Sequence, residues 1–224
     1  MRLALITTLG AIALAASSAA AENLDAIWTG ILNNPPSLEH TEARNAALKA
    51  LDERLMEPDS ERAEDVIAYY QRAVDRVLDA LESERVKKGI RLFQLYSSSV
   101  IVQTPETIFA IDLDQGPNKS MSMSASDEGV GFRMTPGQIE RLVRLVDVSF
   151  HTHEHYDHVD FELARAFCEA GKSVVVTQSN KALWKDEPWA GKLVTFNQTI
   201  DKPHPLGSLT VDVLWDHQWD DEEH

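Results

Sequence analysis

Four of the chain's eight histidines lie within eight residues, immediately after a short run of strand-forming residues. The run is Asp147-Val148-Ser149-Phe150, and the cluster is His151-Thr152-His153-Glu154-His155-Tyr156-Asp157-His158. Folds of the α/β class place their chemistry at the ends of strands. Neutral imidazole and carboxylate groups are good ligands for zinc and similar divalent ions. The sequence therefore predicts a metal site at the end of a strand.

The spacing within the cluster suggests how the ligands divide between metals. In extended chain, side chains two positions apart point to the same side, so His153 and His155 can reach one ion. Asp157 and His158 follow a turn later and can reach a second. His151 offers a competing His-x-His-x-His register, which the spacing leaves open. The alternative is that these histidines are ordinary surface or core residues that bind no metal. It is less favoured because four histidines cluster with an aspartate.

The register His153-x-His155-x-Asp157-His158 resembles the signature of the metallo-β-lactamase superfamily, which also follows a strand. The next residues are Val159-Asp160 rather than Gly-Gly or Gly-Asn. This continuation is similar to the branch that holds ascorbate-phosphate lactonase and N-acyl-phosphatidylethanolamine phospholipase D. The resemblance implies a four-layer αβ/βα sandwich. It also implies a third histidine for the first metal after a later strand, a position that His217 takes here.

The activity implied by the resemblance is that of a zinc-dependent hydrolase with one or two Zn²⁺ ions. The implied ligands are His153, His155, Asp157, His158 and His217. Metal-bound hydroxide would attack an ester, lactone or phosphodiester of a small or lipid-like substrate, because zinc lowers the pKa of bound water to about 7. Asp157 would be the catalytic residue that orients this hydroxide and accepts its proton. Replacing His151, outside this register, with alanine is expected to cost little metal affinity.

The resemblance covers residues 90–224, and the implied sandwich has a second half that supplies further ligands. The chain ends shortly after His217, so we expect an incomplete domain with an apolar face of its sheet exposed. An alternative function is therefore a non-catalytic metal-binding or scaffolding fragment that lacks half of the active site. In either case the 224-residue chain is expected to hydrolyse little or no substrate.

Charge and cysteine content exclude two further possibilities. The formal net charge of −15 argues against binding nucleic acid, whose phosphates require clustered Lys and Arg. The single cysteine, Cys168, rules out an intramolecular disulfide.

The first 21 residues are typical of a secretory signal peptide. Arg2 supplies the positive start, residues 3–16 form an apolar run, and Ala19-x-Ala21 fits the cleavage rule, so Glu22 would begin the mature chain. The alternative, a membrane anchor, is disfavoured because the run is short and ends in small residues. We therefore expect a bacterial periplasmic or secreted protein with no stable membrane span after cleavage.

The mature chain divides into a helical region, 22–89, and the metallo-β-lactamase-like domain, 90–224. Apolar residues at helical spacing predict a long helix that ends at Gly89. From residue 90, strand-like runs alternate with helical ones, which predicts an α/β fold. The sequence Thr135-Pro136-Gly137-Gln138 predicts a capped helix start. His204 lies between two prolines and is expected in a loop. Strands are expected at 90–95, 99–104, 107–113, 173–177, 192–196 and 209–214.

Overall fold

The computed structural model describes residues 24–38, 41–58, 60–116, 132–155, 157–196 and 202–213. The predicted signal peptide and His217 lie outside these residues. The chain divides into two compact units. The first runs to Ala73 and includes Phe132 and Arg133, and the second contains the other described residues from Val74 onward. Within the described residues, no helix is long and apolar enough to cross a membrane.

The first unit is helical. It contains a helix over 24–33, α2 (Glu42–Leu55), the short η1 (Ser60–Arg62) and the first half of α3 (Glu64–Ser83). The ring of Trp28 meets that of Tyr69 edge-on, with centroids 5.2 Å apart. The guanidinium of Arg54 binds the carboxylate of Asp65 with two hydrogen bonds, of 2.7 and 3.3 Å. These contacts hold the helices of the unit against one another.

Helix α3 ends at Ser83, so the prediction that it ends at Gly89 is wrong. Gly89 does adopt a left-handed φ of +77°, but it lies in the connection that follows the helix. Directly beyond the end of the helix, the strands of the second unit bind the chain. Gln103 Nε2 donates to the carbonyl of Glu84 at 3.1 Å. Arg85 also donates to backbone carbonyls in the turn between two of these strands.

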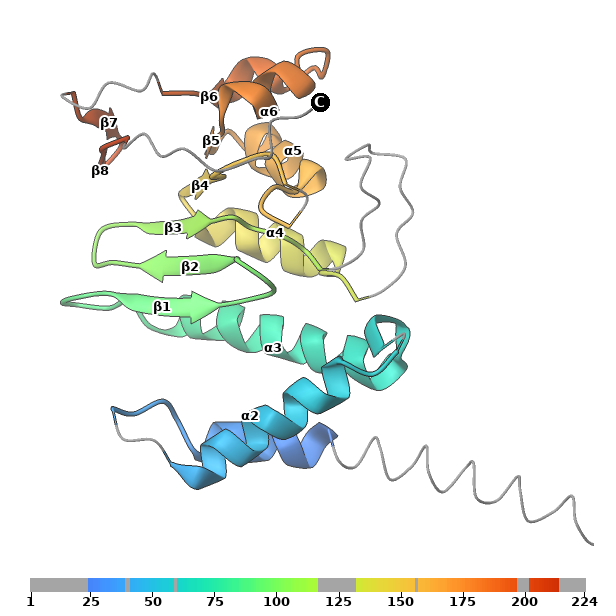
Figure 1. Cartoon of the computed structure of the whole chain (residues 1–224). Helices are drawn as coiled ribbons and strands as arrows, with labels where there is room; N and C mark the ends of the chain where they lie inside the picture. Colours follow the sequence, from blue (N-terminus) through green and yellow to red (C-terminus); the bar gives the residue numbers. More distant parts are fainter. Residues whose placement is uncertain are drawn as a thin grey trace, which may run out of the picture. The chain divides into compact units, whose positions relative to one another are not determined.

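The second unit is built on a six-stranded mixed sheet (Figure 1). Its strands lie in chain order, β1 to β6. The first two pairings are antiparallel, and the pairings from β3 to β6 are parallel. The strands are β1 (Arg91–Gln94), β2 (Val100–Gln103), β3 (Ile108–Ile111), β4 (Val148–Phe150), β5 (Ser173–Val175) and β6 (Leu193–Val194). Each lies within a run whose composition predicts a strand, and the α/β class is confirmed.

A separate hairpin follows, made of β7 (His204–Leu206) and β8 (Leu209–Val211). His204 pairs with Val211 in this hairpin, so the prediction that it lies in a loop is wrong. The flanking prolines are compatible with a strand here because a two-stranded ribbon has free edges, where a missing N–H costs no ladder bond. Gly207, at φ +61°, makes the turn.

The helices that connect the parallel strands are α4 (Pro136–Leu145), α5 (Phe161–Glu169) and α6 (Gln178–Leu183), with η2 (Ala190–Lys192) before β6. Each crossover moves the chain one strand further in the same direction, and right-handed crossovers then place α4 and α5 on the same face (Figure 1). The predicted capping box of α4 is confirmed, because Thr135 and Gln138 bond reciprocally.

The two faces of the sheet differ in burial. Side chains of directly paired residues point to the same face, and one such row is fully buried: Ile101, Ala110, Ser149 and Val174. The opposite face carries buried valines, Val102, Val148 and Val175, together with half-buried apolar residues, Val100, Phe109, Ile111 and Phe150, and an exposed one, Leu92. The rings of Phe109 and Phe150 meet edge-on there, with centroids 5.9 Å apart. An apolar, partly exposed face therefore exists among the described residues.

An ion-pair cluster joins the second half of α3 to α4. Arg141 of α4 donates to the carboxylates of Asp75, Asp79 and Glu82. Arg144 reaches the same Glu82, at 2.7 Å. These hydrogen bonds hold the pKa of Glu82 below its ordinary value, and the one from Arg141 has the largest effect. The acids on this face of α3 are partly exposed to solvent, and three of them also bind the neighbouring helix.

Candidate metal centre

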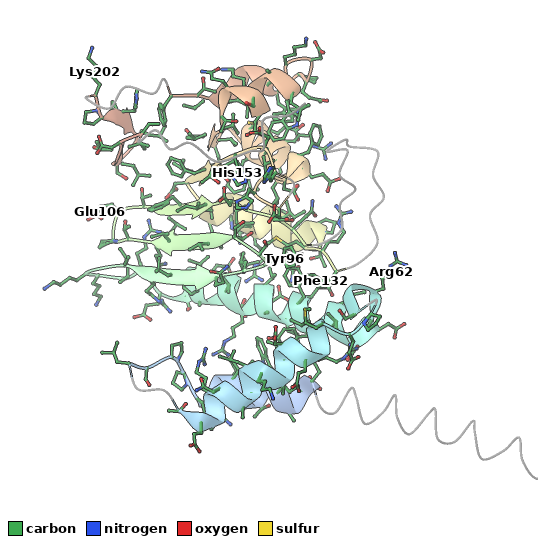
Figure 2. All side chains as sticks on the ribbon, in the orientation of Figure 1. Arg62, Tyr96, Glu106, Phe132, His153 and Lys202 are labelled. Atoms are coloured by element: carbon green, nitrogen blue, oxygen red, sulfur yellow. The ribbon has the colours of Figure 1, made fainter. Side chains whose placement is uncertain are left out.

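The predicted site lies on the loop between β4 and α5, where Figure 2 labels His153. The neighbouring parallel strand β3 ends on the same side of the sheet, and Asp112 follows it directly. The backbone N–H of Asp112 donates to the carbonyl of Phe150 at 2.8 Å, and that of His151 donates to Val175 at 2.9 Å. The loop is therefore attached to strands on both sides of β4.

The structure gathers three of the predicted ligand rings. The ring centroid of His153 lies 4.0 Å from that of His158 and 4.5 Å from that of His155. Asp157 Oδ2 lies 3.6 Å from Nε2 of His158. Within the described ranges, however, no three His, Cys, Asp or Glu side chains are placed so that they could hold a metal ion. The rings are close, but their donor atoms do not yet converge, and His217 lies outside these ranges.

Asp112 fixes the tautomer of His153 through Thr152. The backbone N–H of Thr152 donates to Asp112 Oδ1 at 2.8 Å, and its hydroxyl lies 3.0 and 2.9 Å from the two carboxylate oxygens. A hydroxyl has one proton, and Thr152 uses it to donate a hydrogen bond to the carboxylate. The hydroxyl oxygen, 3.0 Å from Nδ1 of His153, must then accept the Nδ1–H. The lone pair of the neutral His153 ring is therefore on Nε2.

That Nε2 atom is the least satisfied group of the site. It is buried, and among the described residues it has no hydrogen-bond partner. Burial of a polar atom without a partner costs about 1–3 kcal/mol. A ligand that accepts a lone pair, such as a divalent ion, would remove this cost.

His158 presents the same nitrogen for the same reason. Its Nδ1 lies 2.9 Å from Asp112 Oδ2 and donates to this carboxylate, which leaves the lone pair on Nε2. Histidines that bind metals usually donate the other ring N–H to a carboxylate, a carbonyl or a similar acceptor. One carboxylate thus orients two of the predicted ligands, His158 directly and His153 through a hydroxyl.

The electrostatic environment favours neutral imidazole. Burial lowers the pKa of His153 below its ordinary value, and the neighbouring His158 and His155 add to this effect. Asp112 and Glu154 oppose it. The neutral form is the one that binds a metal. Protons therefore compete with a metal for Nε2 of His153 less strongly than they would in a free imidazole.

A turn between β1 and β2 supports the loop from the other side. Ser98 Oγ donates to the carbonyl of Asp157 at 2.9 Å, and Ser97 Oγ lies 3.4 Å from its Oδ2. Ser97 has a left-handed φ of +51°, which a serine adopts rarely. The strained turn therefore reaches the half-buried carboxylate of Asp157.

The sequence-based site omits several of these residues. Asp112 ends a β-rich run, and this position at a strand end is the signal that could have marked it as part of the site. Thr152 precedes the first ligand directly but has no distinctive pattern. Ser97 and Ser98 carry no sequence signal, because only the tertiary fold brings them to Asp157. His151 is buried, and its ring nitrogens lie beside the hydroxyl of Ser149 and the backbone carbonyl of His158.

No protein-family model and no curated protein matches this chain. A function for the chain therefore rests on the chemistry of its own residues. Imidazole and carboxylate are the donor types that divalent ions prefer, and two of these imidazoles present Nε2 lone pairs beside a third ring and a carboxylate, although the donor atoms of the described residues do not converge on one point.

Proposed function

We propose that this chain is a metal-dependent hydrolase of the metallo-β-lactamase fold, with zinc as its metal. The observation that carries the proposal is Nε2 of His153, which is buried, has no hydrogen-bond partner among the described residues and lies beside two further histidine rings. The local sequence, the position at the carboxyl ends of parallel strands and the Asp112 carboxylate behind the rings all support it.

In this proposal the ligands divide as the sequence suggests. His153 and His155 hold the first ion, with His217 as the third ligand. Asp157 and His158 hold the second. A bound divalent ion would supply a Lewis acid and would lower the pKa of a coordinated water. Asp112 and Thr152 keep two of the imidazoles in the tautomer that such an ion requires.

Asp157 is the proposed proton acceptor. Its carboxylate is half-buried and lies 3.6 Å from Nε2 of His158. Ser98 donates to its backbone carbonyl at 2.9 Å, so the backbone that carries the carboxylate is held in place, and Ser97 Oγ lies 3.4 Å from its Oδ2. The proposed substrate is an ester, lactone or phosphodiester, the classes that the resemblance of the motif implies, and metal-bound hydroxide can attack each of them. The signal-like residues 1–21 support export to the periplasm.

A non-catalytic metal-binding role is the second candidate. It is favoured by the finding that the described side chains do not place three donor groups around one point. It is also favoured by His155, which is exposed. In that role the chain would bind zinc, and Asp157 would be a ligand only.

Metal analysis and an activity assay together test the proposal. The purified protein should contain zinc, iron or manganese, and the absence of all three above background would refute both candidates. Nitrocefin, an acyl-homoserine lactone and bis-p-nitrophenyl phosphate should be assayed side by side. Metal-dependent hydrolysis of the lactone or phosphodiester, lost in Asp157→Asn and retained in Asp147→Asn, supports the enzyme and would show that the expectation of little or no hydrolysis by this chain is wrong. Metal without turnover supports the binding protein, and turnover of nitrocefin alone overturns the branch that the motif suggests.

A further inference from the structure

His151 is a buried histidine whose two ring nitrogens both have partners. It is the first residue after β4, and only 4% of its surface is exposed. Nδ1 lies 2.9 Å from the carbonyl oxygen of His158. Nε2 lies 3.2 Å from Oγ of Ser149, which is itself 1% exposed. The ring therefore spans the loop, from its first residue to the residue that ends the metal-site cluster.

These partners define the protonation of the ring. A carbonyl oxygen can only accept, so Nδ1 of His151 carries a proton and donates it to His158. In the neutral ring, Nε2 then holds the lone pair and accepts the hydroxyl proton of Ser149. Both nitrogens are thus engaged inside the protein, which leaves His151 no lone pair for a metal.

His158 is consequently held at three points. Its ring is held by Asp112, at 2.9 Å from Nδ1, and its carbonyl is held by His151. Its own N–H closes the turn by donating to the carbonyl of His155 at 2.9 Å. Of these restraints, the one from His151 connects the turn to the end of β4, so it determines how far His158 lies from the sheet.

We propose that His151 is a positioning residue, which sets the backbone of His158 through its Nδ1–H and so places the Nε2 of His158 for metal binding. The inference rests on the proposed function, because it concerns the affinity of that site. It also reverses the expectation from sequence, in which replacing His151 costs little because it lies outside the ligand register.

Three substitutions separate the hydrogen bond from simple filling of space. His151→Leu fills most of the volume but cannot donate. His151→Asn places an amide nitrogen at the position of Nδ1, where it can still donate to His158. His151→Gln places its amide nitrogen further out, toward Ser149, and serves as the matched control with the same functional group.

Cobalt(II) binding is the readout, measured by competition for affinity and by visible absorption for geometry. His151→Leu and His151→Gln should bind Co²⁺ about 10–100-fold more weakly with a changed spectrum, as for other residues that orient metal ligands. His151→Asn should restore most of the affinity and the wild-type spectrum. Equal affinity and an unchanged spectrum in the leucine variant would overturn the proposal. Loss of binding in all three variants, with circular dichroism showing folded protein, would make His151 a ligand and overturn it as well.

A measurement on the metal-free wild type does not depend on the variants folding. Long-range ¹H–¹⁵N correlation spectra should show His151 as the Nδ1–H tautomer, and the Nε2–H tautomer would overturn the inference. If the wild type shows this tautomer but binds no Co²⁺, the proposed function fails, and the positioning role fails with it. If the wild type binds Co²⁺ and the leucine variant does so equally, only the positioning role fails.

Discussion

Asp112 Oδ2 lies 2.9 Å from Nδ1 of His158, across the gap between two parallel strands. The same buried carboxylate accepts the hydroxyl proton of Thr152, which in turn accepts from His153. Asp112 adopts a left-handed φ of +50°, so the chain turns sharply there to present the carboxylate to the loop. One residue outside the histidine cluster therefore determines the tautomers of two residues inside it.

Asp112→Asn should lower the affinity for zinc by about 10–100-fold, the usual effect of losing an outer-shell partner. An amide has a single acceptor oxygen, so it cannot serve both His158 and Thr152, and its N–H₂ would face one of their donors. Competition with a chromophoric chelator measures the affinity.

Asp147→Asn is the matched control for this variant. Asp147 precedes β4, and its carboxylate accepts from the N–H of Ile108, at the other end of the same two strands. Its substitution should leave zinc affinity unchanged. An equal loss in both variants would mean that Asp112 acts through the stability of the sheet and not through the histidines.

Thr152→Val should weaken zinc binding by about tenfold, because it removes the hydroxyl that accepts from His153 Nδ1 and keeps the shape of the side chain. Thr152→Ser keeps the hydroxyl and should bind nearly as the wild type does. Isothermal titration with zinc compares the two. Weaker binding by the serine variant than by the valine variant would contradict the relay from Asp112 to His153.

His155→Ala should lower zinc affinity by roughly tenfold or more, since losing a ligand costs at least as much as losing an outer-shell partner. Glu154→Ala, a neighbouring exposed residue, is the control and should change the affinity little. Equilibrium dialysis followed by metal analysis gives both values. If the two substitutions had the same effect, His155 would not be a ligand.

The sequence predicts the parts of this fold that depend on neighbouring residues. The capping box at Thr135 is local, and so are the strand runs on either side of the Pro105-Glu106 turn. What the sequence does not predict depends on strand pairing. Asp112 accepts a hydrogen bond from Thr152, which lies 40 residues later in the chain, and Ser98 donates one to Asp157, which lies 59 residues later. No periodicity records such a contact, because it exists only once the sheet has formed. His204 is predicted wrongly because its prolines indicate a loop and its pairing with Val211 is not visible locally.

Cys168 should resist alkylation in the folded protein. Burial raises the pKa of its thiol from 9.0 to about 11, so at pH 8 only about one thiol in a thousand is ionised. Iodoacetamide at pH 8 should label it slowly until denaturant is added, as mass spectrometry would show. Since the folded pKa is the higher one, the linked stability is present below pH 9 and decreases as the pH rises toward 11. Rapid native labelling would mean that α5 opens locally.

Removal of metal should lower the unfolding temperature. A ligand that binds only the folded state, at a hundred times its Kd, stabilises it by about 2.7 kcal/mol, and binding to the unfolded chain reduces that figure. Thermal unfolding of the purified protein with zinc and with EDTA measures the difference. Asp112→Asn should show a smaller difference than the wild type. An identical unfolding temperature with zinc and with EDTA would contradict a specific site.

The proposed ligands from His153 to His158 are near neighbours in the chain, whereas Asp112 reaches them only through the pairing of β3 with β4. An unfolded chain therefore already carries four of the donor groups, without the residue that orients them. Refolding with metal present should capture the ion loosely at first, while the slower non-local pairing is still incomplete. Binding should tighten when Asp112 arrives. The cobalt absorption of a refolding sample would then develop in two phases, and the rate of the second phase would report how fast the sheet forms.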